Sequence, residues 1–238
     1  PLKEIIQYGF SIKSFAEHSP ICLAGENKEF VNNYMTKGGQ SIFKPAHAKD
    51  IFPENEIISL IGAKEGIGHA AFCFINPGDI ALVPDPGYPV YSIGTLFAGG
   101  QSYMMPLTAN NGWLPDIDAI PTNVANKAKV IWLNYPNNPT GAIATLDYYK
   151  HVVKFAEKYN IAVLHDACYT EITYDGYKPQ SFLETPGAMD IGAEFHSLSK
   201  TFNMTGWRLG MAAGNKDIID KLLIVKSNLD SGVPAAIQ

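Results

Sequence analysis

From residue 56 onward, short apolar runs alternate regularly with segments of helical periodicity. Each apolar run is bounded by turn residues, which is typical of a buried strand. Strands that alternate with helices pair mostly in parallel and need helices on both faces to cover them. The pattern predicts an α/β fold: a three-layer sandwich around a mostly parallel sheet. The predicted strands are Glu56–Ile61, Ile80–Val83, Gln101–Leu107, Lys129–Asn134, Ile161–Leu164 and Gly192–Ser197.

Helices are predicted between these strands, most clearly from Thr145 to Tyr159. The apolar residues of this segment recur at the spacing of one helix face. Thr145 is a residue type that caps helix N-termini, and Asp147 suits the positive first turn. The other predicted helices are Ala63–Ile75, Tyr88–Ala98 and, with a weaker pattern, Asp116–Lys127.

The first fifty residues differ from the rest of the chain, because they are rich in Lys, Asn, Ser and Gly and show poor periodicity. We assign residues 1–50 to a lead-in segment with a short helix at Leu2–Tyr8 and no site. Residues 51–238 are then one large domain.

Composition excludes several classes of partner. The formal net charge is −5 and no basic stretch is dense enough for a nucleic-acid footprint. No apolar run approaches the roughly 20 residues that span a bilayer, and the first residues lack a secretory pattern. Cys22, Cys73 and Cys168 have no CxxC spacing, which argues against a disulfide framework or a metal site. We expect a cytoplasmic protein in which Cys73 and Cys168 are buried thiols.

The strongest local signal is the segment from His196 to Arg208, HSLSKTFNMTGWR. Lys200 stands among small hydroxyl residues, and Arg208 follows eight residues later. A lysine amine condenses with an aldehyde, while Ser197, Ser199 and the arginine fork can hold a phosphate. The segment therefore suits a phosphorylated aldehyde cofactor. A surface lysine followed by a salt-bridged arginine is the alternative.

A second signal follows the predicted strand that ends at Leu164. Ligands of such sheets bind beyond the carboxyl ends of the strands. A carboxylate at this position, Asp166, is costly to bury unless it has a charged partner. The protonated nitrogen of a pyridine ring would be such a partner, and Tyr169 could hydrogen-bond a phenolic oxygen of the same ring. Alternatively, Asp166 caps a following helix.

Three weaker signals fit the same ligand. Asn138, in the turn NNPTG, could donate to the phenolic oxygen, although such turns are common. The segment Gly62–Gly66 joins a strand to a helix, where the backbone of Ala63 and Lys64 could bind an anion, or it is an ordinary turn. Tyr88 lies between prolines and could present its ring for stacking, or it is a core tyrosine.

Taken together and in this order, these five elements resemble the class I/II aminotransferases, which are fold-type I enzymes that use pyridoxal phosphate (PLP). The resemblance runs from about Glu56 to Gln238. Within the family, three further stretches are similar to the LL-diaminopimelate aminotransferase group: Pro84–Tyr91, Gly94–Gly100 and Ser227–Gly232.

The resemblance implies that this is the PLP-binding large domain and that PLP is its cofactor. It implies that Lys200 forms the Schiff base and shuttles the proton, that Asp166 pairs with the pyridinium, and that Lys64 can also touch a substrate carboxylate. Catalytic roles are implied for Lys200, Asp166 and Tyr169. Cofactor contacts are implied for Ala63, Lys64, Tyr88, Asn138, Asp166, Tyr169, Ser197, Ser199, Lys200 and Arg208.

The implied activity is transamination between an amino acid and a 2-oxo acid, with glutamate and 2-oxoglutarate as one pair, in lysine biosynthesis. The family also implies a homodimer. Chains of the family continue beyond the position of Gln238 with a small domain and an arginine for the substrate α-carboxylate, so we expect that domain to be absent here. The alternatives are another aminotransferase, a PLP lyase on the same fold, and a truncated non-catalytic homologue that acts as a binding module.

Overall fold

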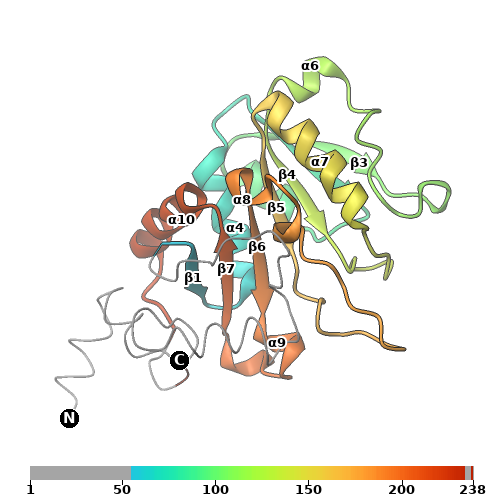
Figure 1. Cartoon of the computed structure of the whole chain (residues 1–238). Coiled ribbons are helices and arrows are strands. Elements are labelled where there is room, and N and C mark those ends of the chain that lie inside the picture. Colours follow the sequence, from blue (N-terminus) through green and yellow to red (C-terminus); the bar gives the residue numbers. More distant parts are fainter. Residues whose placement is uncertain (1–54, 234–236, 238) are drawn as a thin grey trace, which may run out of the picture.

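The computed structural model describes residues 55–233 and 237, which form a seven-stranded sheet between layers of helices (Figure 1). The strand order is β1-β7-β6-β5-β4-β2-β3, and within this sheet β7 alone runs antiparallel to its neighbours. The predicted three-layer α/β sandwich with a mostly parallel sheet is confirmed. The strands are β1 (Ile57–Leu60), β2 (Ile80–Asp85), β3 (Gln101–Pro106), β4 (Ala128–Asn134), β5 (Ala162–Asp166), β6 (Gly192–Ser197) and β7 (Gly210–Gly214).

Helices cover both faces of the sheet, with α4, α5 and α10 on one face and α7 and α8 on the other (Figure 1). Among the described residues, no helix combines the length and the apolar character needed to cross a membrane. The helices are α4 (Ala63–Phe74), α5 (Val90–Phe97), α6 (Thr122–Ala125), α7 (Leu146–Tyr159), α8 (Ala188–Ile191), α9 (Leu198–Thr201) and α10 (Lys216–Leu229).

The interior strand β4, which lies between β5 and β2, contributes side chains to both hydrophobic cores. Its successive side chains point to opposite faces of the sheet. Val130 and Trp132 belong to the core beneath α4, α5 and α10, while Ile131 and Leu133 belong to the core beneath α7. Helices bury both faces of the sheet here, so the strand has a continuous run of apolar residues rather than an alternation of apolar and polar ones.

Most predicted elements lie where the pattern placed them. The strand predicted at residues 192–197 matches β6, and the helix predicted at residues 145–159 matches α7. Thr145 caps α7, because its side chain accepts a hydrogen bond from the backbone N–H of Tyr148 at 3.2 Å. The lead-in segment, its short helix and Cys22 lie outside the described residues.

The predicted helix from Asp116 to Lys127 is wrong, since only the single turn α6 forms there. The Asp116 carboxylate accepts hydrogen bonds from the backbone N–H groups of Asp118 and Ala119, which makes a turn instead of a helix. Pro121 then stands directly before α6 and cannot donate a backbone hydrogen bond. Local polar chemistry overrides the weak apolar pattern.

The two described cysteines are unpaired. Cys168 is buried as predicted, whereas Cys73 is only half-buried, which corrects that expectation. Burial raises the pKa of the Cys73 thiol to about 12 and that of the Cys168 thiol well above its ordinary value. Neither thiol is therefore ionised near neutral pH.

Candidate active site

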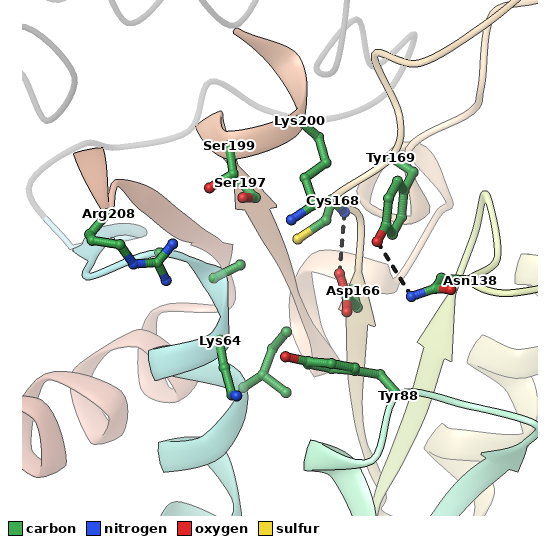
Figure 2. A pocket seen from close by; sticks show the side chains of 13 residues that line it. Lys64, Tyr88, Asn138, Asp166, Cys168, Tyr169, Ser197, Ser199, Lys200 and Arg208 are labelled. Carbon is green, nitrogen blue, oxygen red and sulfur yellow. Dashed lines mark hydrogen bonds between the residues drawn. The ribbon is translucent and has the colours of Figure 1, made fainter. Parts of the chain in front are cut away.

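A pocket of about 260 Å³ lies at the carboxyl ends of β5 and β6 (Figure 2). It brings together all ten side chains and backbone positions singled out in the sequence, although they are spread over residues 63–208. It also includes three positions to which no role was assigned, Gly62, Ile67 and Cys168. The predicted site residues lining the pocket are Ala63, Lys64, Tyr88, Asn138, Asp166, Tyr169, Ser197, Ser199, Lys200 and Arg208.

Asp166 ends β5 and is only 5% exposed. Its Oδ2 accepts a hydrogen bond from Tyr91 Oη at 2.7 Å, and its Oδ1 accepts one from the backbone N–H of Cys168 at 3.2 Å. Among the described residues, no cationic side chain forms an ion pair with it. A carboxylate so deeply buried is stabilised by a positive charge, which a ligand in the pocket can supply.

Tyr91 is a functional candidate that sequence reasoning missed. It lies in the first turn of α5, is 1% exposed, and stacks on Trp132 with ring centroids 4.7 Å apart. Burial, followed by the nearby charge of Asp166, raises its pKa well above the ordinary value. Its hydroxyl is therefore a hydrogen-bond donor at neutral pH. The only sequence signal was its place three residues after Tyr88 in an apolar helix start.

The Asn138 side of the pocket is organised by Asn134, which ends β4 beside Asp166 in the sheet register. The Asn134 amide donates to the carbonyl oxygen of Asp166 at 2.8 Å and accepts from the backbone N–H of Asn138 at 2.8 Å. Asn138 in turn donates to Tyr169 Oη at 3.4 Å. The two residues predicted to share one ligand oxygen therefore contact each other.

The opposite side of the pocket gathers anion-binding groups (Figure 2). Ser197 ends β6, while Ser199 and Lys200 lie on α9. Arg208 donates to the carbonyl oxygens of Thr205 at 3.0 Å and Ile61 at 3.4 Å. The N-terminus of α4 adds backbone N–H groups that have no partner within the helix.

Gly62 is required where Arg208 crosses the turn before α4. Its φ of +73° lies in the left-handed region, and a Cβ atom there would stand 2.5 Å from Arg208 Nη2. Any other residue would be strained and would also displace the guanidinium. The turn Gly62–Lys64 and the Arg208 guanidinium thus depend on each other and form one anion-binding cradle.

The donor set fits PLP. Lys200 carries an amine that can condense with an aldehyde, and in Figure 2 its side chain points into the pocket towards Cys168. The hydroxyls of Ser197 and Ser199 and the guanidinium of Arg208 lie together on one side, as a phosphate requires. Asp166 supplies the acid for a ring nitrogen. One small molecule with an aldehyde, a phosphate and a basic ring would satisfy all of these groups.

A second polar cluster is centred on Glu194 of β6; its residues are buried, and none of them lines this pocket. Its carboxylate contacts His165 Nδ1 at 2.9 Å and His196 Nε2 at 3.2 Å, and accepts from Ser181 Oγ at 2.9 Å. The backbone N–H of Tyr135 donates to His165 Nε2 at 3.3 Å, so the ring proton lies on Nδ1 and is donated to Glu194. Although burial opposes ionisation, hydrogen bonds from the two histidines hold the pKa of Glu194 well below its ordinary value.

Several solved structures share this fold. Substrate-bound BacF from Bacillus subtilis superposes with a TM-score of 0.81 at 38% identity, over 99% of this chain and 57% of that one. A probable N-succinyldiaminopimelate aminotransferase from Thermus thermophilus gives 0.79 at 31% identity, over 100% and 61%. The fold and site thus define an aminotransferase-type α/β domain. The profile of the family described as aminotransferase class I and II matches residues 13–238, and the chain belongs to that family.

Curated relatives point to one group within the family. A protein from Moorella thermoacetica named LL-diaminopimelate aminotransferase is 55% identical over 215 residues, which cover 87% of this chain and 55% of that protein. One of the same name from Dehalococcoides mccartyi is 61% identical over 186 residues, covering 78% and 48%. The matched regions thus span about half the length of these relatives.

Proposed function

We propose that this chain is the PLP-binding domain of an aminotransferase that exchanges the amino group of LL-diaminopimelate with a 2-oxo acid, using glutamate and 2-oxoglutarate as the other pair. The main support for the proposal is that one pocket contains a lysine amine (Lys200), a buried carboxylate (Asp166) and the anion-binding cradle. The substrate assignment rests on the names of relatives that are 55–61% identical to this chain. Residues 51–238 form the large domain in this proposal.

When bound, PLP supplies an electron-accepting ring that stabilises negative charge at the substrate's α-carbon. In the proposal, Asp166 keeps the ring nitrogen protonated, and Tyr91 holds the carboxylate in place for that task. Asn138 and Tyr169 donate to the phenolic oxygen, and Tyr88 stacks on the ring. The Lys200 amine would bind the cofactor through its aldehyde and, as a free amine, would be the group that moves the α-proton.

The phosphate would be held by Ser197, Ser199, Arg208 and the start of α4. Fixed donors on a helix N-terminus and a guanidinium recognise a dianion without rearrangement. The phosphate-binding groups and Asp166 lie on different sides of the pocket, so one bound molecule could contact both at once (Figure 2).

We also propose that two copies act together. Leu96 and Phe97 are adjacent on α5 and are 64% and 72% exposed, and contiguous exposed apolar side chains can mark a protein–protein contact. The family resemblance supplies the second copy as that partner. Sedimentation analysis of the protein should give twice the chain mass.

The proposed function is tested by trapping the cofactor on the protein. Wild-type protein incubated with PLP and reduced with borohydride should gain one phosphopyridoxyl group on the peptide that contains Lys200, which is the mass of PLP less one oxygen atom because imine formation releases water and the reduction adds two hydrogens. Lys200→Ala should gain none, because the amine that reacts with the aldehyde is gone. Mass spectrometry of the digested protein makes the measurement. A label that appears on Lys64, the other pocket lysine, or that persists in the variant would contradict the assignment.

An amino-transfer assay then decides the reaction type. The protein that carries the cofactor should convert LL-diaminopimelate in the presence of 2-oxoglutarate and form glutamate. Release of ammonia without a 2-oxo acid would instead indicate a lyase on the same fold. Labelling of Lys200 with neither reaction would indicate a PLP-binding protein that does not transaminate by itself.

A further inference from the structure

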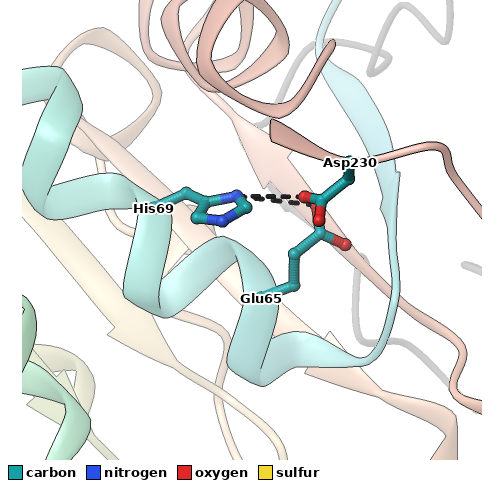
Figure 3. Close-up of side chains that lie close together, drawn as sticks. All are labelled: Glu65, His69 and Asp230. Atoms are coloured by element: carbon teal, nitrogen blue, oxygen red, sulfur yellow. Dashed lines mark ion pairs between the residues drawn. The ribbon is translucent and has the colours of Figure 1, made fainter. Parts of the chain in front are cut away.

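A cluster of ionisable side chains lies outside the pocket, where the first turns of α4 meet the end of α10 (Figure 3). Glu65 and His69 come from α4, Lys226 from α10, and Asp230 follows α10 directly. All four side chains are largely buried, with exposed fractions from 7% for Glu65 to 21% for Asp230. Burying this many charges is costly unless they compensate one another.

Glu65 is the centre of this cluster. Its Oε1 accepts a hydrogen bond from Lys226 Nζ at 2.7 Å, and its Oε2 accepts from the backbone N–H of Ile61. His69 Nδ1 lies 3.7 Å from Glu65 Oε1 and 3.3 Å from Asp230 Oδ2. Three ligand atoms this close could hold a metal ion, but the ammonium group of Lys226 already supplies the cation. We therefore interpret the cluster as an ion-pair network between two helices.

The contact with Ile61 leads from this network to the pocket. Ile61 directly precedes Gly62, where the cradle turn begins, and its two backbone polar groups are both engaged from outside the strand. Glu65 accepts from its N–H, and Arg208 donates to its carbonyl oxygen at 3.4 Å. The backbone of Ile61, just before the turn, is thus held by Glu65 of the α4–α10 network through its N–H and by Arg208 of the pocket through its carbonyl oxygen.

We propose that Glu65 and Lys226 are positioning residues that hold the turn Gly62–Lys64 and Arg208 in the geometry that binds the phosphate of the cofactor. The proposal rests on the proposed function, because it assigns the cradle to that phosphate. Neither residue lines the pocket, so both act through Ile61 and the turn. The ring-binding side of the pocket, with Asp166 and Tyr169, does not depend on them.

The test compares affinity for PLP with affinity for pyridoxal, which has the same ring and aldehyde but no phosphate. The ratio of the dissociation constant of pyridoxal to that of PLP measures how much the phosphate contacts of the cradle contribute to affinity. Glu65→Ala removes the acceptor for Ile61 and should lower the ratio about tenfold, the effect of losing one hydrogen bond to a charged group. Glu65→Gln keeps an acceptor oxygen for Ile61 but turns its amide NH2 towards Lys226 Nζ, so it should lower the ratio by about as much as Lys226→Met and by less than Glu65→Ala. Binding is measured by absorbance titration.

Lys226→Met provides a second, independent variant if Glu65→Ala fails to fold, and it should lower the ratio in the same direction. Lys216→Met is the matched control, because Lys216 lies on the same helix in an exposed pair with Asp220 at 2.6 Å. It should leave the ratio unchanged. A wild-type ratio in Glu65→Ala or Lys226→Met would overturn the proposal, as would an equal fall in Lys216→Met. If the wild-type protein itself shows no preference for PLP, the proposed function fails instead.

Discussion

At the scale of single residues, Asp166 and Tyr91 form the most consequential pair in the pocket. The phenol donates to the carboxylate at 2.7 Å and leaves lone pairs of both carboxylate oxygens for a further donor. Because the donor is neutral, it does not supply the cationic partner that a buried carboxylate requires. A tyrosine suits this task better than a lysine or arginine, which would neutralise the carboxylate before any cofactor arrived.

Replacing Tyr91 with phenylalanine should weaken PLP binding about tenfold, because one hydrogen bond to a buried charged group is lost while the ring packing on Trp132 is kept. The affinity is measured by absorbance titration. In an Asp166→Ala background the same change should cost nothing further, since Tyr91 then has no carboxylate to hold. Tyr149→Phe is the control, because Tyr149 is equally buried but belongs to the core on the opposite face. Additive losses in the double variant would show that Tyr91 acts otherwise.

Residue identities were the most predictable part of the site. Lys200, Asp166 and Arg208 are residue types whose chemistry is specific. Asp166 ends β5 and Lys200 follows β6, at strand ends that a parallel sheet brings together, whereas Arg208 stands just before the antiparallel β7, which begins at the same edge. Tyr91 and Asn134 could not be found this way. Tyr91 lies at an apolar helix start and Asn134 at a strand end, and neither position indicates a polar contact in the sequence. Their hydrogen bonds to Asp166 become visible only in the folded structure.

At the scale of elements, the close approach of α4 to its neighbours depends on one of its two glycines, Gly66. A methyl group at Gly66 would stand 2.6 Å from a methyl carbon of Leu60 and 3.1 Å from the ring of Phe195. A methyl group at Gly68 would meet only Val90, at an ordinary 3.8 Å. The two glycines lie two residues apart in one helix, yet a larger side chain has room at Gly68 and none at Gly66.

Gly68→Ala should therefore raise the free energy of unfolding by about 0.5–1 kcal/mol, because alanine has the higher helix propensity and finds space. Gly66→Ala gains the same propensity but overpacks the core, at a cost of about 1–3 kcal/mol, so its net effect should be destabilising. Urea unfolding of both variants beside the wild type makes the comparison. Equal effects of the two substitutions would mean that packing around α4 does not decide the outcome.

The elements that the sequence did not predict have physical reasons for being obscure. β7 has the sequence GMAAG, which lacks the branched and aromatic residues that favour strands. Gly210 is small because a Cβ atom there would stand 2.6 Å from the backbone nitrogen of Ala63. Burial between β1 and β6, rather than local preference, makes this segment a strand. α10 does carry a readable signal, because Asn215 caps it through two backbone N–H groups.

At the scale of the whole molecule, the Glu194 cluster joins parts of the chain that are far apart in sequence. It connects β5 through His165, β6 through Glu194 and His196, and the segment at Ser181. Through His165 it also holds the backbone of Tyr135, at the start of the loop that carries Asn138. The cluster has no access to the pocket, so its contribution is to the stability of the sheet that positions the site.

That role predicts a specific dependence of stability on pH. The pKa of Glu194 lies lower in the folded protein than its ordinary value of 4.5, so the carboxylate stabilises the fold above that pH. The stability is lost as the pH falls below 4.5, by up to about 1.4 kcal/mol per pH unit. Glu194→Gln should be less stable than the wild type at pH 7, and the difference should shrink as the solution is acidified below 4.5. Urea unfolding at several pH values measures it.

The comparison between variants reports on Glu194 together with the two histidines that contact it, because all other titrating groups are common to both proteins. Asp220→Asn is the matched control, since Asp220 is a carboxylate 44% exposed in a surface pair with Lys216. Exposed pairs contribute little, so this variant should follow the wild-type curve. A difference between Glu194→Gln and the wild type that stays constant from pH 7 to pH 3 would show that the histidines hold the carboxylate by packing and not by its charge. In that case the acid sensitivity of the fold would have to arise elsewhere in the sheet.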